Sequence, residues 1–226
     1  ERRTERLDLG LALTAHEVRA PVVGALAILE RLLLEDPEAG DHRTLIDRSR
    51  QQLQQLAGLI DGMLRWAVAG EPLRLASTDL MDVVREAVAA SARDTGQDRV
   101  RIAGPKTVPV HADAEHLRVA VSNVVRNALV YSPATTRVGV TVRVRDGRAL
   151  VTVRDRGPGV PVSERDSIFD PFIRGSAAHL VRAGNGLGLF IARRVIEAHR
   201  GRIWLDGSRS GAVFHLELPT AEQGDR

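Results

Sequence analysis

The stretch Asp155-Arg156-Gly157-Pro158-Gly159 decides how the rest of this 226-residue chain is interpreted. It follows an apolar run over residues 149–153, whose alternating pattern predicts a strand. A carboxylate therefore stands at a strand end, where the chain enters a turn with two glycines. The glycines permit positive φ and let a ligand approach the backbone closely. The stretch thus predicts a hydrogen-bond acceptor suited to an exocyclic amine, although alone it fits an ordinary turn equally well.

The composition indicates a globular chain with an aliphatic core. Apolar residues make up 43% of the sequence and aromatic residues only 3%, and there is no cysteine to form a disulfide or a thiolate metal site. No apolar run approaches the roughly 20 residues of a membrane span. The net charge is +3, the basic residues are interleaved with acidic ones, and few aromatic rings could stack on bases. We therefore expect no nucleic-acid partner.

Two long helices are predicted in the N-terminal third of the chain. Apolar residues recur every three or four positions over residues 7–32 and again over 45–67, and residues 36–41 interrupt the pattern. Pro21 should bend the first helix. A lone antiparallel hairpin cannot cover both stripes, so the pattern predicts a four-helix bundle formed by a homodimer. The alternative is a hairpin that serves dimerisation without any chemistry.

The pattern changes after a linker at residues 70–72. Short strands are predicted at 73–76, 100–102, 108–110, 138–145, 149–153, 202–205 and 212–218, with helices from Thr78 or Asp79 to about 93, at 114–131 and at 187–199. Mixed strands and helices in this order predict a sheet covered by helices on one face. The predicted fold class is therefore α+β, with a helical hairpin over 1–70 followed by an α/β sandwich over 71–226.

Three further groups of residues have chemical potential. Asn123 and Asn127 lie one turn apart on a predicted helix, so their amide oxygens share a face and can ligate a hard cation, although surface amides are the simpler explanation. The glycine-rich run 184–189 opens the last helix and can expose backbone N–H groups to phosphate. His16 falls off the apolar stripe, so we expect an exposed imidazole with Glu17 beside it. Such a ring is a competent nucleophile toward phosphorus, but a lone exposed histidine is usually inert.

Together these residues resemble the cytoplasmic core of bacterial sensor histidine kinases over nearly the whole chain. Five segments look like the family's sequence boxes in their expected order: the phosphoacceptor box at 16–21, the asparagine box at 123–128, the first glycine box at 155–159, the phenylalanine box at 168–175 and the second glycine box at 184–189. The resemblance implies an ATP-binding domain of the histidine kinase, gyrase and chaperone ATPase type. Five boxes together are specific where a single box is not.

The resemblance also implies a role for each matching residue. Asp155 would take the adenine amine, with Gly157 and Gly159 beside it, and Asn127 with Asn123 would hold Mg²⁺ between the ATP phosphates. Tyr131 would lie near the nucleotide, and Arg174 would approach the terminal phosphate. Gly184, Gly186 and Gly188 would shape the lid and its hinge, and Leu187 is the remaining nucleotide-binding position. Glu17 would act as the base while His16 attacks the γ-phosphorus in line.

The implied activity is ATP-dependent autophosphorylation of His16, followed by phosphoryl transfer to an aspartate of a response regulator. Two departures stand out: Val130 replaces a frequent lysine, which removes one phosphate-facing cation, and Ala20 cannot position the water for phosphatase activity. A nucleotide-binding dimer that leaves His16 unused and a plain ATPase are the alternative functions. Since the chain begins with Glu1 rather than Met, we expect a fragment of a longer protein, anchored in the inner membrane through an N-terminal sensor region.

Overall fold

The computed structural model describes residues 72–91, 99–176, 186–207 and 211–221, together with six isolated helical positions: Gly24, Ala27, Ile46, Asp47, Ser49 and Leu53. The chain divides into two compact units, Glu1–Leu64 and Arg65–Arg226, and the fold below is that of the second unit. The predicted hairpin lies outside the described residues apart from those six positions, as do His16, Glu17 and Gly184. None of the helices in the described part of the chain has the length and hydropathy that a membrane crossing requires.

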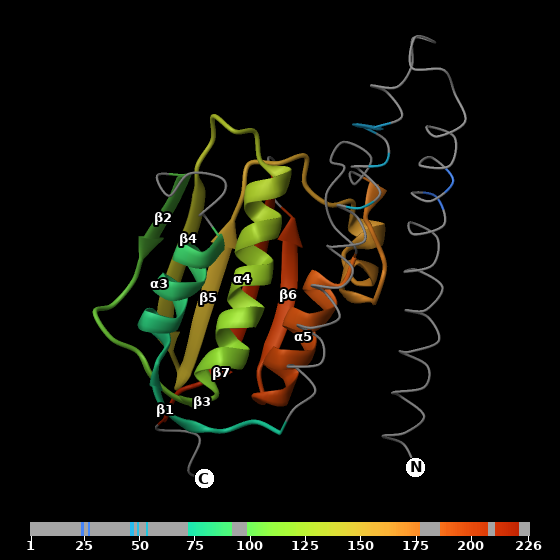
Figure 1. Ribbon diagram of the computed structural model, residues 1–226. Coiled ribbons are helices and arrows are strands. Elements are labelled where there is room, and N and C mark those ends of the chain that lie inside the picture. Colours follow the sequence, from blue (N-terminus) through green and yellow to red (C-terminus); the bar gives the residue numbers. More distant parts are fainter. Residues whose placement is uncertain are drawn as a thin grey trace. The chain divides into compact units, whose positions relative to one another are not determined.

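The described part of the second unit alternates strands with three α-helices (Figure 1). In chain order the elements are β1 (Ala76–Asp79), α3 (Leu80–Ser91), β2 (Val100–Ala103), β3 (Pro109–Ala112), α4 (Ala114–Tyr131), β4 (Val138–Arg145), β5 (Arg148–Arg154), the short 3₁₀ turns η2 (Val162–Glu164) and η3 (Ser167–Phe169), α5 (Gly188–Ala198), β6 (Arg202–Gly207) and β7 (Ala212–Pro219).

Five strands form one mixed sheet in the order β2-β4-β5-β7-β6, and β1 pairs with β3 in a separate antiparallel ribbon. The β2–β4 pair is parallel, whereas the other neighbours in the sheet are antiparallel. The predicted hairpin between β4 and β5 is confirmed: Asp146 and Gly147 turn the chain with φ of 51° and 71°, as a two-residue hairpin turn requires. Pairing of β5 with β7 is the feature that matters for the site, because it brings residues 155 and 212 together.

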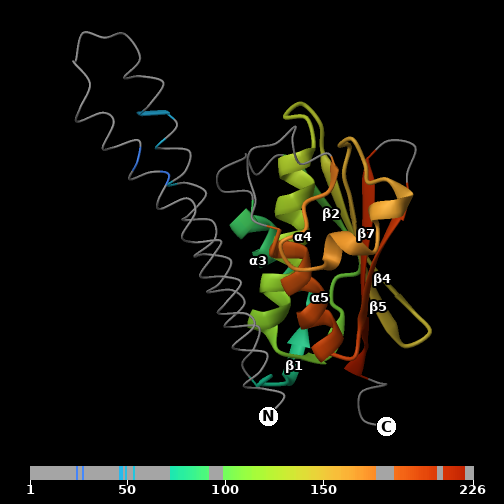
Figure 2. The same cartoon turned by 90° about the vertical axis from the view of Figure 1, so that its right-hand side faces the viewer.

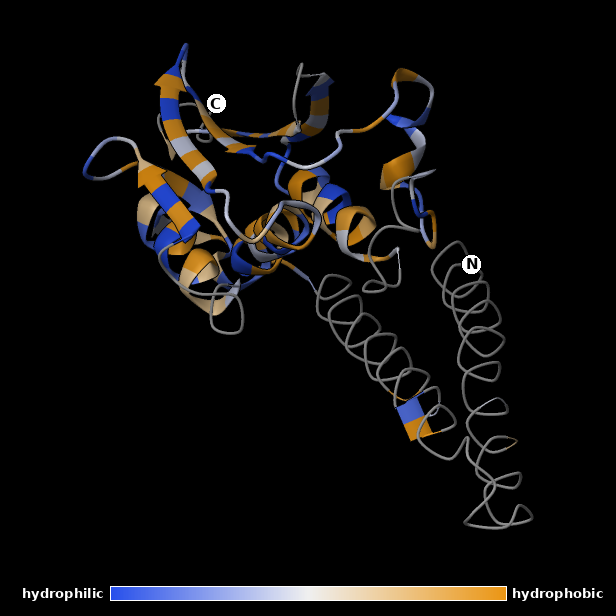
Figure 3. Cartoon of the chain, turned by 90° about the horizontal axis from the view of Figure 1, so that it is seen from above, coloured by the Kyte–Doolittle hydropathy of each residue, from blue (hydrophilic) through white to orange (hydrophobic). Residues whose placement is uncertain are grey.

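The three helices cover one face of the sheet, and Figure 2 shows the two layers edge-on. This confirms the predicted α/β sandwich. Along β4 and β5 the residues alternate between buried and partly exposed, and Figure 3 shows the same alternation as orange and blue bands on the strands. The apolar residues on the inner face of α4 are buried, namely Leu117, Val121, Val124, Val125 and Ala128. The sheet and its helices therefore share one aliphatic core.

The first strand lies further along the chain than the sequence predicted. The prediction of a strand over 73–76 was wrong, because β1 occupies Ala76–Asp79 and pairs with β3 from Ala76↔Ala112 to Asp79↔Pro109. The alternating leucines at 73 and 75 gave a strand pattern, but the available partner β3 fixes the pairing. Asp79 caps α3 as expected, since its Oδ1 accepts hydrogen bonds from Met81 N–H and from Val108 N–H, each at 2.9 Å.

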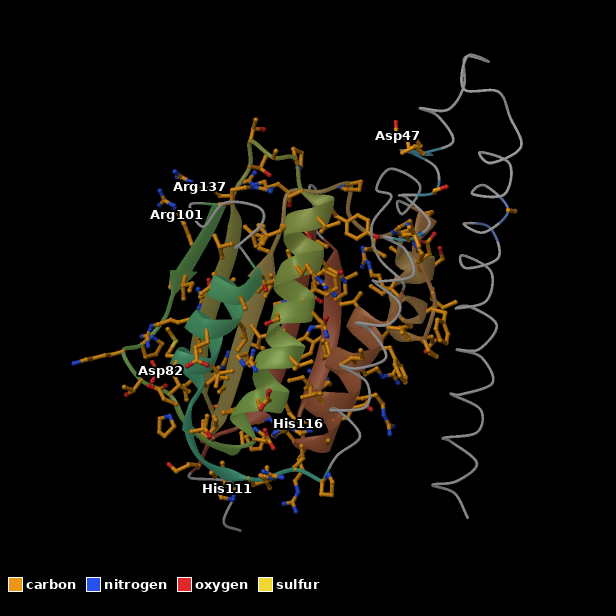
Figure 4. All side chains as sticks on the ribbon, in the orientation of Figure 1. Asp47, Asp82, Arg101, His111, His116 and Arg137 are labelled. Atoms are coloured by element: carbon orange, nitrogen blue, oxygen red, sulfur yellow. The ribbon has the colours of Figure 1, made fainter. Side chains whose placement is uncertain are left out.

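A buried polar cluster lies at the start of α4 near β1 and β3, where Figure 4 labels His116. Asp113 caps α4: its Oδ1 accepts from His116 N–H at 3.1 Å and its Oδ2 from Arg74 N–H at 2.9 Å. His199 Nε2 accepts from Asp113 N–H at 3.0 Å, which requires a neutral ring whose Nδ1 donates to the Val195 carbonyl. The cluster thus joins the starts of α4 and β1 to the end of α5.

Burial lowers the pKa of His199, outweighing the hydrogen bond from Nδ1 to Val195. Burial also opposes ionisation of Asp113, but the backbone N–H groups of Arg74 and His116, with the His116 ring, hold its pKa at about 2. The Asp113 carboxylate therefore contributes about 2 kcal/mol of stability, which is present above its ordinary pKa of 3.8 and lost as the pH falls toward 2.

Because His199 is held neutral, we expect the free energy of unfolding to fall as the pH drops below about 6.5. In that range His199 binds a proton in the unfolded chain but not in the folded chain. His199→Gln keeps an acceptor for Asp113 N–H without titrating, so its stability should change less between pH 7 and 5. Urea unfolding at several pH values measures this slope. His111→Gln, at an exposed position in β3, is the matched control, and equal slopes in both variants would contradict the assignment.

Candidate functional site

Asp155 stands where β5 ends, and it is buried with 4% of its surface exposed. Its Oδ1 accepts two backbone hydrogen bonds, from Gly157 N–H at 2.8 Å and from Ala212 N–H at 3.0 Å. Its Oδ2 has no hydrogen-bond partner among the described residues. Burial raises the pKa of this carboxyl above its ordinary value, although the two N–H groups act in the opposite direction. A rigidly held oxygen that still needs a donor is what an exocyclic amine can satisfy.

The turn after Asp155 packs directly against the end of α4. A Cβ added to Gly157 would lie 2.7 Å from the Tyr131 carbonyl oxygen, so no other residue fits there without a backbone shift. Arg156 N–H donates to Ser132 Oγ at 3.1 Å, which fixes the same two segments a second time. Tyr131 and Gly157, both predicted to lie at the nucleotide, are therefore brought together. The carboxylate at the end of β5 lies near the C-terminal end of α4.

The β7 side of the turn is equally close. Gly211 has φ of 85°, and a Cβ there would contact the Asp155 carbonyl. Gly159, with φ of 77°, lies where a Cβ would be 3.1 Å from the Gly211 carbonyl oxygen. Backbone from β5 and β7 thus encloses the carboxylate on the side opposite α4.

The two predicted asparagines have different surroundings on α4. Asn127 is partly exposed, whereas Asn123 is buried with 2% of its surface exposed. Asn123 Oδ1 accepts a hydrogen bond from Arg126 Nη2 at 3.2 Å, and its Nδ2 has no acceptor in the described part of the chain. A Cβ added to Gly188 would lie 3.4 Å from Asn123 Oδ1. The start of α5 is therefore in contact with the asparagine face of α4.

The chain before α5 is pinned back to the phenylalanine box. Phe172 N–H donates to the Gly186 carbonyl at 3.1 Å. This hydrogen bond, which we call the neck, joins the two residues that flank positions 173–185. Gly186 has φ of 72°, and a Cβ there would lie 2.6 Å from the Phe172 carbonyl carbon, so glycine is required. Leu187 precedes α5 with a side chain that is 4% exposed, so that side chain belongs to the core. The backbone is what Leu187 can offer a ligand.

Arg174 lies on the exposed segment just after Phe172 of the neck. The segment is held by Glu164, whose Oε2 accepts from Ser176 N–H at 2.8 Å and lies 3.1 Å from the position that a Cβ on Gly175 would take. A carboxylate on η2 thus fixes the backbone that carries Arg174. Sequence reasoning did not identify Glu164, because its contact is made twelve residues away.

These contacts form a continuous series along α4, from Asp155 and Gly157 at Tyr131 to Gly188 at Asn123. Tyr131 and Asn123 are eight residues apart, or about 12 Å along the helix, so one elongated ligand can reach both ends. The predicted residues Asn123, Tyr131, Asp155, Gly157, Gly159, Gly186 and Gly188 all take part in these contacts. Besides Glu164, the sequence missed three contributors: Ser132, Gly211 and Ala212. Only the pairing of β5 with β7 reveals the last two, while Ser132 carried no distinguishing signal.

Acidic or imidazole metal ligands do not gather here. In the described ranges no group of three or more histidine, cysteine, aspartate or glutamate side chains could hold a metal ion. A hard cation at this site would instead be bound by amide oxygens of α4 and by oxygens of the ligand itself. Mg²⁺ accepts such a shell, since it usually keeps only one or two protein ligands and fills the rest with phosphate and water.

Sequence comparison places the domain in a known class of protein. Residues 112–222 match the sequence profile of the histidine kinase-, DNA gyrase B-, and HSP90-like ATPases. The described fold, with its two-layer sandwich and a carboxylate at the end of β5, is therefore that of an ATP-binding domain of this class.

Relatives narrow the assignment. The chain is 30% identical to the adaptive-response sensory kinase SasA of Synechococcus sp. over 94% of this chain and 59% of that protein. It is also 30% identical to the solved histidine kinase domain of the E. coli osmosensor EnvZ, over 67% of this chain and 92% of that one, with a TM-score of 0.50. The histidine kinase ThkA, solved in complex with the response regulator TrrA, shares the fold at 24% identity and a TM-score of 0.72, over 98% of this chain and 65% of that one. The chain belongs to the sensor histidine kinase family, and it spans about 59% of the length of the SasA relative.

Proposed function

We propose that this chain is the kinase core of a two-component sensor, which transfers the γ-phosphoryl group of ATP to its own His16. The observation that carries the proposal is the Asp155 carboxylate, whose Oδ1 accepts from two backbone N–H groups while no described residue donates to Oδ2. This arrangement suits the amine of adenine. The relatives named above, all of them sensory or histidine kinases, support the same activity.

The nucleotide would lie along α4 between Tyr131 and Asn123. Adenine would meet Asp155 beside Gly157, Gly159 and Tyr131, and the phosphates would extend toward Asn127 and the start of α5 at Gly188. The run that includes Gly184, Gly186 and Leu187 would offer backbone N–H groups to phosphate oxygens, because helix N-termini favour anions. Arg174, fixed through Glu164, would approach the terminal phosphate. The contacts of Asp155, Gly157 and Gly188 support these roles, as does the order of the sequence boxes.

Bound Mg²⁺ would neutralise charge on the ATP phosphates, and the amide oxygen of Asn127 is our proposed ligand for it, with Asn123 as the second candidate. In the transfer step a ring nitrogen of His16 attacks the γ-phosphorus. The bond from that phosphorus to the β–γ bridging oxygen breaks, so ADP leaves. Glu17 takes the proton from the other ring nitrogen. Such transfers depend mainly on positioning and charge neutralisation rather than on covalent chemistry by the protein.

The phosphoryl group would then pass to an aspartate carboxylate of a response regulator. ThkA was solved with such a protein, TrrA, and this supports a receiver-domain partner for the present chain. We also propose that residues 1–70 form the predicted helical hairpin, which dimerises and presents His16, while residues 71–226 form the catalytic domain. Anchoring of the full-length protein in a membrane through a further N-terminal region belongs to the same proposal.

The activity is tested by incubating the protein with γ-labelled ATP and Mg²⁺. We expect an acid-labile label on the protein that is lost completely in His16→Ala, while nucleotide binding is unchanged because His16 holds no part of the ATP. His111→Ala, at an exposed position in β3, should keep the label. Steady phosphate release without a phosphoprotein would favour a plain ATPase. A label retained by His16→Ala would show that another residue accepts the phosphoryl group.

A further inference from the structure

We propose that Arg126 is the cation that binds the phosphate chain of ATP in this protein, and that Asn123 positions Arg126 rather than ligating Mg²⁺. The inference rests on the proposed function, since it concerns the same nucleotide site. It assigns Asn127 alone as the amide ligand of the metal. Sequence reasoning named Asn123 for the metal and gave Arg126 no role.

The first observation is the contact between the two side chains. Arg126 Nη2 donates to Asn123 Oδ1 at 3.2 Å, and three residues of separation on α4 put the pair on one face of the helix. Asn123 is 2% exposed and therefore fixed, whereas Arg126 is partly exposed. The buried amide thus draws the guanidinium toward the face that Asn127 shares.

The second observation is the donor left over on Asn123. Its Nδ2 is buried and has no acceptor in the part of the chain that the structure describes, and a buried unpaired donor is costly. The absent side chain of Gly188 leaves the neighbouring space open, since a Cβ there would reach within 3.4 Å of Asn123 Oδ1. An amide N–H, a guanidinium and the N-terminal end of the eleven-residue helix α5 therefore lie close together. All three favour an oxyanion.

Electrostatics argue against a metal ion on Asn123. Its Oδ1 already accepts from a guanidinium, and a Mg²⁺ ion bound to the same oxygen at about 2.1 Å would bring two cations close together. Asn127 Oδ1 carries no such neighbour in the hydrogen bonds of the described residues. The repulsion is avoided if the metal takes Asn127 and the guanidinium keeps Asn123.

The third observation is that the C-terminal half of α4, from Asn123 to Tyr131, contains no basic residue besides Arg126. Val130 follows Arg126 by one helical turn, so both lie on the same side of α4, and valine offers no charge to a phosphate. Arg126 is the basic residue nearest to Asn127 in the sequence. A planar guanidinium also matches phosphate oxygens with two parallel hydrogen bonds.

The test compares the affinity for Mg–ATP with that for adenosine, by titration calorimetry on the full chain. Arg126→Ala should lower the affinity for ATP at least about tenfold. The affinity for adenosine, which has no phosphate to bind Arg126, should stay within about twofold. Arg126→Lys should recover part of the loss as a point charge. The matched control is Arg118→Ala, because Arg118 is a partly exposed arginine on the same helix whose guanidinium pairs with Glu115. An unchanged ratio of ATP to adenosine affinity in a folded Arg126→Ala variant would overturn the inference.

The role of Asn123 is separated by the Mg²⁺ dependence of ATP binding. Asn127→Ala should raise the Mg²⁺ concentration needed for half-maximal binding, whereas Asn123→Ala should weaken ATP without moving that concentration. The double variant Asn123→Ala/Arg126→Ala should lose less ATP affinity than the two single losses combined, because part of the Asn123 effect passes through Arg126. A shifted Mg²⁺ requirement in Asn123→Ala would make Asn123 a metal ligand after all. Failure of the proposed function looks different: the wild type would bind ATP through Arg126 but never acquire phosphohistidine.

Discussion

Asp155→Asn should weaken ATP binding by a factor on the order of 100 or more while the domain stays folded. Asparagine keeps an Oδ1 that can accept from Gly157 N–H and Ala212 N–H, so the local backbone is preserved. The change falls on the outer atom, where an NH₂ donor replaces the free oxygen and faces the amine of adenine. Equilibrium binding of ATP and of inosine triphosphate, whose base carries a carbonyl at that position, measures the effect. The preference for ATP over the inosine nucleotide should shrink or reverse.

The stability of the same variant shows whether a loss of ATP binding comes from unfolding of the domain. Burial raises the pKa of Asp155, which means that the ionised carboxylate is less favourable in the folded chain than in the unfolded one, so it costs stability at neutral pH. Removing the charge should therefore leave the melting temperature equal or higher. Asp146→Asn, in the exposed β4–β5 turn, should change neither property. Full ATP affinity in Asp155→Asn would show that this carboxylate does not hold the base.

Gly157→Ala should lower ATP affinity by about ten- to a hundredfold and destabilise the domain by about 1–3 kcal/mol. The new Cβ would stand 2.7 Å from the Tyr131 carbonyl oxygen and 3.2 Å from Asp155 Oδ1. Because both neighbours of the methyl group are fixed, the turn has to move away from α4, and it takes the carboxylate with it. Calorimetric titration with ATP and chemical unfolding of the same sample give the two quantities.

A second glycine supplies the control for this prediction. Gly139 lies in β4, and a Cβ added there meets nothing within 4 Å. Gly139→Ala should therefore keep the ATP affinity and raise the stability by up to about 1 kcal/mol, since alanine loses less conformational freedom on folding. If Gly157→Ala bound ATP as well as Gly139→Ala does, the turn at 155–159 would not be part of the nucleotide site.

Local patterns predicted much of the second unit correctly. The helix over Ala114–Tyr131 and the strand over Val138–Arg145 have the predicted bounds, because each combines a clear period with strong end signals: Asp113 caps the helix and Asp146-Gly147 ends the strand. The first strand was misplaced, since its position depends on β3 and not on its own sequence. Periodicity fixes an element, but only its partner fixes its register.

The site was predicted at the level of its sequence boxes and not at the level of its supports. Asp155 was found because it follows a strand and precedes glycines, both of which are local features. Its second backbone donor, Ala212, comes from a strand 57 residues later, and no local pattern announces that pairing. The same holds for the hydrogen bond from Arg126 to Asn123 Oδ1, which depends on side-chain direction. Long-range pairing and side-chain direction are the information that a pattern lacks.

The neck between Phe172 and Gly186 has a consequence for how this domain can diversify. Its two ends are already joined by a backbone hydrogen bond, so the intervening chain does not need any particular length to keep the sandwich closed. Doubling such a connection costs only about 0.6 kcal/mol in closure entropy. The segment between Phe172 and Gly186 can therefore be replaced, in evolution or by design, with a shorter or longer one while β5, α4 and α5 keep their places.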